Sequence, residues 1–149
     1  MYKVKKTLTD SCFLACIESY LLDNNIEYID QKYMVQKLSA INLCSGTGVV
    51  QFDHIKCACR VINIELNEVK YHFPIHNNYN DGALLIGTSK GNNHHCVRYY
   101  KQEEEAKIIV MDPESGDYMI YDKGWLENMN PRYFYVKFIP NINAAPVKL

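Results

Sequence analysis

The chain has 149 residues, 48% of them hydrophobic, and a formal net charge of −1 at pH 7. This length and hydrophobic content suffice for one core and are short for two, so we expect residues 1–149 to form a single domain. The balanced charge does not favour nucleic acid or an anionic membrane as a partner. The basic residues are scattered, apart from Lys3, Lys5 and Lys6, which we interpret as exposed residues of an edge strand.

Targeting signals are not evident in the sequence. No apolar stretch approaches the roughly 20 residues needed to span a bilayer, and the N-terminus lacks the hydrophobic region of a signal peptide. We therefore expect no direct membrane insertion. Six cysteines without a secretory signal are expected to be reduced thiols, which favours the cytoplasm as the location. Delivery into another cell without a cleaved signal is the alternative.

The first predicted elements are an N-terminal strand or extended arm and a helix that begins near Ser11. Thr9, Asp10 and Ser11 are all residue types that cap helix N-termini, and apolar residues then recur at helical spacing. Cys12 therefore lies in the first turn. A helix N-terminus favours a thiolate through its unpaired N–H groups and its dipole, so Cys12 is a candidate nucleophile.

The remaining elements are predicted from apolar periodicity and turn signals. Two further helices and an antiparallel sheet after them indicate an α+β fold with N-terminal helices packed on the sheet. Residues 102–106 are expected to form a hairpin loop, and residues 140–149 an irregular tail. The helices are Gln31–Ser39 and Val49–Arg60, and the strands are Val61–Asn67, Ala83–Gly87, His95–Lys101, Lys107–Asp112, Asp117–Tyr121 and Tyr133–Phe138.

His95 and Asp112 are the candidate partners of Cys12. His95 enters a predicted strand from a turn, where an imidazole can meet a cysteine at a helix start. Antiparallel pairing of the next strand brings Asp112 near the start of the histidine strand. An acceptor there can orient the imidazole and stabilise its protonated form. His94 is a neighbour, but adjacent strand side chains point to opposite faces, so only one of the two can face Cys12.

The other cysteines and histidines have simpler interpretations. Cys16 is expected to be a buried core thiol rather than a resolving partner of Cys12. Cys57 and Cys59, with His54 upstream, are potential metal ligands, but their spacing is not that of a zinc finger or ribbon, and the segment fits an amphipathic helix. We therefore predict no metal site and no cofactor.

These residues resemble the bacteriocin-processing, double-glycine cysteine peptidases, a branch of the papain-like fold often fused to ABC transporters. The resemblance spans nearly the whole chain in order, and it implies a papain-like catalytic domain with the triad Cys12, His95 and Asp112. The matching segments are Ser11-Cys12-Phe13-Leu14-Ala15-Cys16, Gly46-Thr47-Gly48, Ala83–Ile86, His95–Tyr99, Asp112-Pro113-Glu114-Ser115-Gly116, a closing helix in Tyr121–Met129 and a last strand in Tyr133–Ile139.

Two positions depart from that family. Papain-like enzymes have a glutamine six residues before the cysteine that donates to the oxyanion, and Lys6 stands there in this chain. Lys6 and the backbone N–H of Cys12 are the candidate oxyanion donors, with the hydroxyls of Thr7 and Thr9 as alternatives. The family's glycine after the cysteine is Phe13 here, which is expected to crowd an extended peptide.

The expected function is that of a thiol hydrolase, a cysteine peptidase that cleaves a peptide or leader sequence through a thioester. The expected partners are a peptide or protein substrate and a separate transporter or secretion protein. The same triad also serves glutamine deamidases and acyltransferases, and a papain-like domain with weak catalysis can bind peptides instead. The sequence leaves these alternatives open.

Overall fold

The structure, a computed structural model, describes residues 2–25, 29–62, 64–72, 82–86, 95–104, 107–122 and 133–140. Within these ranges the helices come first and the strands follow. The helical elements are α1 (Cys12–Asp23), α2 (Gln31–Ser39), the short 3-10 helix η1 (Phe52–His54) and α3 (Ile55–Val61). The strands are β1 (Ile64–His72), β2 (Gly82–Ile86), β3 (His95–Glu104), β4 (Lys107–Asp112), β5 (Asp117–Asp122) and β6 (Tyr133–Pro140).

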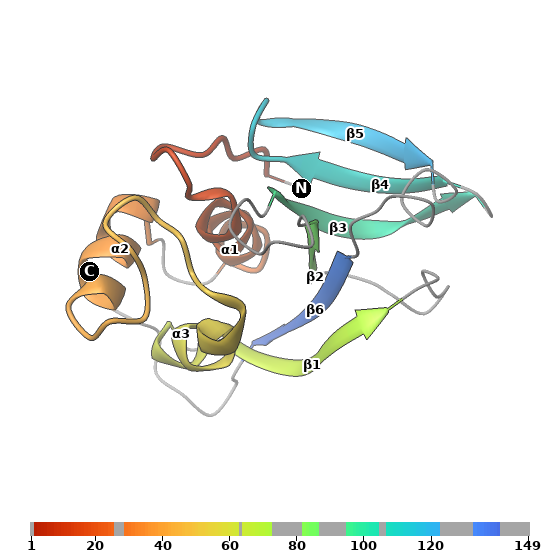
Figure 1. Ribbon diagram of the computed structural model, residues 1–149. Helices are drawn as coiled ribbons and strands as arrows, with labels where there is room; N and C mark the ends of the chain where they lie inside the picture. The colour runs from red at the N-terminus through yellow and green to blue at the C-terminus, as the bar shows by residue number, and fades with distance from the viewer. Residues whose placement is uncertain are drawn as a thin grey trace.

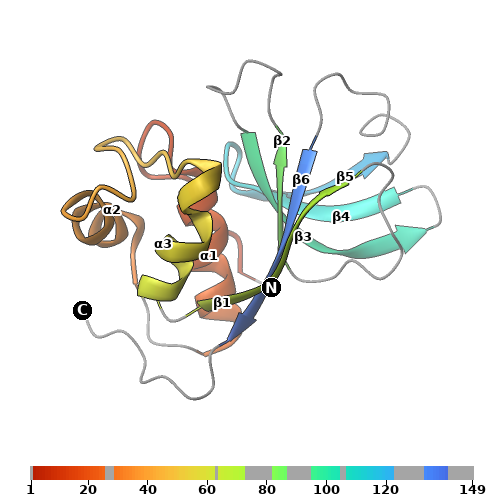
Figure 2. The same ribbon diagram turned by 60° about the horizontal axis from the view of Figure 1, so that its bottom comes forward.

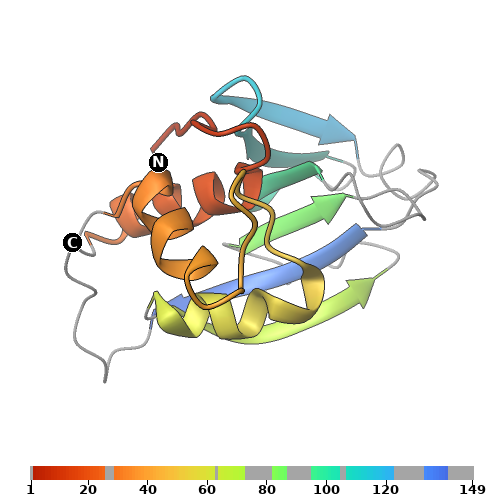
Figure 3. The same cartoon turned by 60° about the vertical axis from the view of Figure 1, so that its left-hand side comes forward.

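The strands form one antiparallel sheet in the order β1-β6-β2-β3-β4-β5. The helices lie together on one side of this sheet (Figures 1 and 2). In Figure 3 they stand in front of it, with α1 nearest the middle strands and α3 over β1 and β6. This arrangement confirms the predicted α+β class, helices packed on an antiparallel sheet. None of the helices within the described ranges is long and apolar enough to cross a membrane.

The predicted bounds of α2 and β4 are confirmed, whereas the helix predicted over Val49–Arg60 begins later. Ser45 and Val49 close a loop instead, because the Ser45 N–H donates to the Val49 carbonyl at 2.9 Å and the Val49 N–H donates to Ser45 Oγ at 2.9 Å. The strand predicted from Val61 also begins later. Val61 belongs to α3, and Ile62 still donates to the Ala58 carbonyl, so β1 starts at Ile64.

Other predictions need correction. No strand occurs in residues 2–10, so the three lysines near the N-terminus do not lie on an edge strand. This arm bonds to scattered partners: Lys6 N–H donates to the Pro113 carbonyl at 2.9 Å, and Thr7 N–H donates to Gln31 Oε1 at 2.9 Å. Residues 102–104 continue β3 rather than forming a loop, and Tyr121 and Asp122 end β5 rather than starting a helix. Residues 105–106, 123–132 and 141–149 lie outside the described residues.

Helix α1 is the centre of the core. Every residue from Cys12 to Leu21 is buried. Its apolar side chains pack with those of α2, α3 and the sheet, so α1 is enclosed on several sides rather than amphipathic. This core includes Leu14, Ile17, Leu21, Met34, Leu38, Ile55, Ala58, Ala83 and Phe138.

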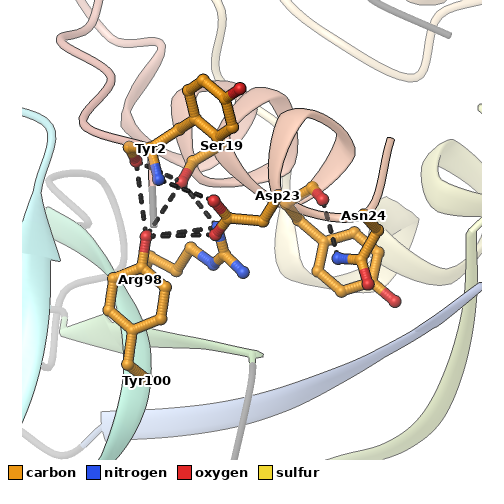
Figure 4. Close-up of polar contacts among 7 residues, drawn as sticks. Tyr2, Ser19, Asp23, Asn24, Arg98 and Tyr100 are labelled. Carbon is orange, nitrogen blue, oxygen red and sulfur yellow. Dashed lines mark hydrogen bonds and ion pairs between the residues drawn. The ribbon is translucent and has the colours of Figure 1, made fainter. Parts of the chain in front are cut away.

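A buried polar cluster joins α1 to β3 and to the N-terminal arm (Figure 4). Arg98 of β3 is 1% exposed, and its guanidinium donates to Ser19 Oγ at 2.6 Å and pairs with Asp23. The Tyr2 N–H donates to the same Asp23 carboxylate at 2.6 Å, and Ser19 Oγ donates to the Tyr2 carbonyl at 2.8 Å. Tyr100 OH lies 3.2 Å from Ser19 Oγ. The cluster therefore fixes the start of the arm that carries Lys6.

Replacing Arg98 by methionine tests this cluster. Asp23 is mostly buried and loses its cation, so R98M should lower the free energy of unfolding by about 3–5 kcal/mol in urea titrations. The matched control is K3M, which breaks the exposed pair between Lys3 and Asp117 and should cost less than about 1 kcal/mol. Equal losses in the two variants would show that the buried cluster has no special role.

Candidate active site

Cys12 is the first residue of α1, as predicted, and Ser11 is the N-cap. The cap differs from the expected one, because the Ser11 side chain makes no capping bond to the helix. Ser11 Oγ instead donates to Gln31 Oε1 at 2.6 Å and accepts from the Leu8 N–H at 3.0 Å. The N–H groups of the first turn, including that of Cys12, are therefore left without a capping oxygen from Ser11, as an anion site at a helix start requires.

The structure brings Cys12, His95 and Asp112 together. His95 Nε2 lies 3.1 Å from Asp112 Oδ1. The thiol of Cys12 lies within 4.8 Å of a ring nitrogen of His95. Because Nε2 is engaged by Asp112, Nδ1 is the ring nitrogen available to the thiol. Asp112 is held in turn by the Glu114 N–H at 2.9 Å and by Tyr121 OH at 3.2 Å.

The charges of this cluster favour a protonated imidazole. Hydrogen bonds to Asp112 and then to Cys12 raise the pKa of His95 from 6.5 to about 10, although burial acts in the opposite direction. Burial alone raises the pKa of Asp112, but the bonds from His95 and the Glu114 N–H outweigh burial and bring this pKa below 3.8. An imidazolium held between a carboxylate and a thiol stabilises negative charge on the sulfur.

The signs of these shifts set a pH window. A raised histidine pKa stabilises the fold fully below about pH 6.5, and this contribution is lost as the pH rises through about 10. A lowered aspartate pKa stabilises the fold above about pH 3.8, and this contribution is lost as the pH falls through the lowered value. Both contributions are therefore present between about pH 4 and 6.5.

Gln31, the first residue of α2, connects the arm to the start of α1. Its side chain is fully buried, and its carbonyl oxygen accepts from the Thr7 N–H at 2.9 Å and from Ser11 Oγ at 2.6 Å. Its amide nitrogen donates to the Lys5 carbonyl at 2.9 Å and to Glu18 Oε2 at 3.1 Å. All hydrogen-bonding positions of the amide are thus used. The residues on both sides of Lys6 are fixed relative to the residue before Cys12.

The loop that contains Gly46-Thr47-Gly48 packs against the same helix start. Asp10 N–H donates to the Thr47 carbonyl at 3.0 Å, and Thr47 Oγ1 donates to Asp10 Oδ2 at 2.8 Å. Gly48 has a φ of +105°, and a Cβ there would lie 2.8 Å from Ser11 Cβ. A glycine is required at position 48 both for its conformation and for the close approach to Ser11.

Lys6, the predicted oxyanion donor, lies beside the cluster. Its ammonium donates to the Thr9 carbonyl at 3.0 Å and pairs with Glu114 Oε2 at 2.7 Å. The bond to Glu114 is the main reason that the pKa of Lys6 is raised, and the nearby Cys12 adds to the effect. Thr7 and Thr9 contribute their backbone groups to the contacts described, and no hydroxyl bond of either is found among the described residues.

One possible metal-binding set is found within the described part of the chain. Cys12, His95 and a carboxylate oxygen of Glu114 lie within 4.8 Å of one another. These donors suit Zn²⁺ by type, but Lys6 already neutralises Glu114, and its ammonium repels a cation. The expected ligand candidates in α3 are not arranged as a site, because Cys59 is buried in the core whereas Cys57 is exposed.

Phe13 and Cys16 of α1 both lie in the core. Phe13 is 5% exposed and packs on Phe138 with ring centroids 6.3 Å apart. It therefore lies in the core, and the expectation that it crowds an extended peptide is wrong. Cys16 is fully buried in the core, as predicted, and its sulfur lies 3.8 Å from that of Cys96. His94 lies outside the described residues.

Gln31 and Glu114 are the residues near the site that the sequence did not reveal. Gln31 is the first residue of an ordinary amphipathic helix, and nothing in that pattern distinguishes a buried glutamine from a solvated one. In the sequence, Glu114 stands out only as part of the Asp-Pro-x-x-Gly turn. Its position after Asp112 was the available signal, because a turn that places one carboxylate at a site also brings its neighbours close.

The fold is similar to that of a known peptidase. No model of a known protein family matches the sequence, and no curated protein matches it. Among solved structures, the peptidase domain of Streptococcus ComA, a bi-functional ABC transporter involved in a quorum-sensing pathway, superimposes with a TM-score of 0.68. The match covers 94% of this chain and 99% of that chain at 17% identity. The chain has this peptidase-domain fold. The predicted resemblance to papain-like, transporter-linked peptidases is therefore confirmed at the level of the fold.

Replacing Asp112 by asparagine tests the source of the histidine shift. D112N should lower the pKa of His95 from about 10 toward 6.5, because Asp112 is the main cause of the rise. The pKa is measured by NMR titration of the His95 ring. The matched control is D117N. Asp117 lies on β5 opposite Asp112 and pairs with Lys3, so its replacement should leave the titration unchanged. An unchanged His95 titration in D112N would contradict the assigned cause.

Replacing Gly48 by alanine tests the packing of the loop on the helix start. G48A should lower the free energy of unfolding by about 1–3 kcal/mol, because the backbone is in a strained region for alanine and the new methyl group meets Ser11. Thermal and urea unfolding measure this loss. G46A is the control, since no atom lies within 4 Å of a Cβ at Gly46. Equal stability of the two variants would exclude the packing role.

Proposed function

We propose that this protein is a cysteine peptidase that cleaves peptide bonds through a thioester on Cys12. The observation that supports this best is the chain of contacts from Cys12 to His95 to Asp112 at the start of a buried helix. The likeness to the peptidase domain of ComA supports the same reaction class. No single part of this arrangement is specific, but each has the position that thiol catalysis needs.

In the proposed reaction, the Cys12 sulfur attacks the carbonyl carbon of the scissile bond, and an oxyanion forms. His95 has already taken the thiol proton in a thiolate–imidazolium pair, and it gives this proton through Nδ1 to the leaving amine while Asp112 holds the ring through Nε2. The backbone N–H of Cys12 and the ammonium of Lys6 donate hydrogen bonds to the oxyanion. Water activated by His95 then hydrolyses the thioester and releases the acid product.

The proposed substrate is a peptide or a leader segment of a protein, and the proposed partner is a separate transporter. ComA is described as a bi-functional ABC transporter, so its peptidase domain works beside a transport function in that protein. Phe13 packs in the core, so its side chain is not an obstacle to an extended peptide. Action in the cytoplasm is proposed because all six cysteines are free thiols.

A peptide library tests the proposed activity. Wild-type protein, C12A and H95A are incubated with proteome-derived peptides and with synthetic peptides that contain a double glycine, and new termini are identified by mass spectrometry. The wild type should produce new termini with a common sequence, and C12A should lower their rate of formation by at least about 10³-fold. New termini that form equally fast with C12A would contradict the proposal. Amide loss from glutamine side chains without new termini would favour a deamidase instead.

A further inference from the structure

Glu114 is a second carboxylate beside the candidate triad, and its position is set by the triad's own aspartate. The Glu114 N–H donates to Asp112 Oδ1 at 2.9 Å, so the turn that holds Asp112 against His95 also places Glu114. One of its carboxylate oxygens lies within 4.8 Å of both Cys12 Sγ and a ring nitrogen of His95. The Glu114 side chain is 59% exposed, so burial does not explain its place.

Glu114 and Lys6 are joined twice, through the side chains and through the backbone of the turn. Glu114 Oε2 lies 2.7 Å from Lys6 Nζ, and the Lys6 N–H donates to the carbonyl of the preceding residue, Pro113, at 2.9 Å. The side chain of Lys6 is only 23% exposed, whereas that of Lys3, which pairs with Asp117, is 53% exposed. Lys6 is therefore fixed, whereas a lysine free in solution samples many rotamers.

Among the described residues, the bonds of the Lys6 ammonium leave one of its N–H donors unused. A lysine ammonium has three N–H donors. One donates to the Thr9 carbonyl at 3.0 Å and one to Glu114, so one donor is left over from these two bonds. Since the Glu114 carboxylate contacts Lys6 Nζ and also lies within 4.8 Å of Cys12 Sγ, the ammonium is near the thiol, and its charge interacts with Cys12.

The charge of the pair also fits the site. An unpaired positive charge beside a thiolate lowers its intrinsic nucleophilicity. Glu114 cancels this charge, so Lys6 and Glu114 together present a neutral unit with a fixed N–H donor. The remaining N–H of the ammonium can still donate to an oxyanion, while Glu114 offsets the extra positive charge beside the thiolate–imidazolium pair.

We propose that Lys6 and Glu114 act as one unit in which Lys6 donates to the oxyanion and Glu114 is the positioning residue that holds its ammonium in place. This inference rests on the proposed function, because an oxyanion forms only if Cys12 attacks a carbonyl. The inference gives Glu114 a role outside the triad. It also explains how Lys6 can take the place of the glutamine that donates to the oxyanion in papain-like enzymes.

Two chemical probes separate an oxyanion effect from a thiolate effect. p-Nitrophenyl acetate acylates a thiolate: an S–C bond forms, an oxyanion appears, and the C–O bond then breaks to release p-nitrophenolate. Iodoacetamide alkylates the same thiolate by direct displacement of iodide, and no oxyanion forms. The ratio of acylation rate to alkylation rate at Cys12 therefore reports oxyanion stabilisation and cancels any change in the fraction of thiolate. Peptide mapping of both products assigns each rate to Cys12, with the exposed Cys57 as an internal reference thiol.

The expected result is a fall in this ratio of at least tenfold in K6A and in E114Q, with K6A/E114Q no worse than K6A alone. In a K6Q background, E114Q should change the ratio less than about twofold, because a neutral amide needs no counter-charge. The matched control is D117N, which breaks the exposed pair with Lys3 from the same hairpin and should leave the ratio unchanged. Thermal unfolding should be similar for E114Q and D117N, since both carboxylates are more than half exposed.

The outcomes distinguish the two proposals. If wild-type Cys12 acylates faster than Cys57 but E114Q keeps the wild-type ratio, the role of Glu114 is wrong and the proposed function stands. If the effects of K6A and E114Q multiply in the double variant, the two residues act separately and the inference is again wrong. If wild-type Cys12 acylates no faster than Cys57, the proposed function fails, and this inference fails with it.

Discussion

The packing of α1 along β3 is the constraint on which the candidate site depends. Three contacts join the two elements in the same direction: Cys12 with His95, Cys16 with Cys96, and Ser19 with Arg98. At the far end, Tyr100 OH donates to Asp23. An α-helix rises about 1.5 Å per residue and a strand about 3.3 Å. The helix from Cys12 to Asp23 and the strand from His95 to Tyr100 therefore both span roughly 16 Å. The thiol and the imidazole meet because the two elements run side by side in register. The buried Arg98 cluster fixes that register at the far end.

The turn between β4 and β5 brings the other parts of the site to this pair. Asp112 reaches His95, the Pro113 carbonyl accepts from the Lys6 N–H, and Glu114 pairs with the Lys6 ammonium. Gly116 has a φ of +73°, and a Cβ there would lie 2.9 Å from Lys5 Cβ, so the arm also packs closely on the end of this turn. One short turn therefore sets both the orientation of the imidazole and the place of the proposed oxyanion donor. Burial of Gln31 sets the same arm against the start of α1.

Much of this arrangement was predictable from local sequence patterns. Helix α2 and strand β4 have strong periodicity and clear turn signals at both ends, and their bounds were predicted correctly. The nearness of His95 and Asp112 followed from antiparallel pairing of consecutive strands. The start of α3 was not predictable, because Val50 and Phe52 share the apolar spacing of the helix that follows, whereas bonds between Ser45 and Val49 hold Val49 in a loop. The roles of Gln31 and Glu114 depend on contacts between segments distant in sequence, and no local pattern encodes them.

The central claim is that Cys12 and His95 form a thiolate–imidazolium pair, and the pH dependence of Cys12 alkylation by iodoacetamide tests it most directly. Rates are measured from pH 4 to 10 by intact mass and peptide mapping, in the wild type and in H95A. The account predicts that Cys12 reacts well below pH 8, ahead of the other five cysteines, and that H95A removes this advantage. A Cys12 that reacts no faster than the exposed Cys57 at every pH, with or without His95, would contradict the account.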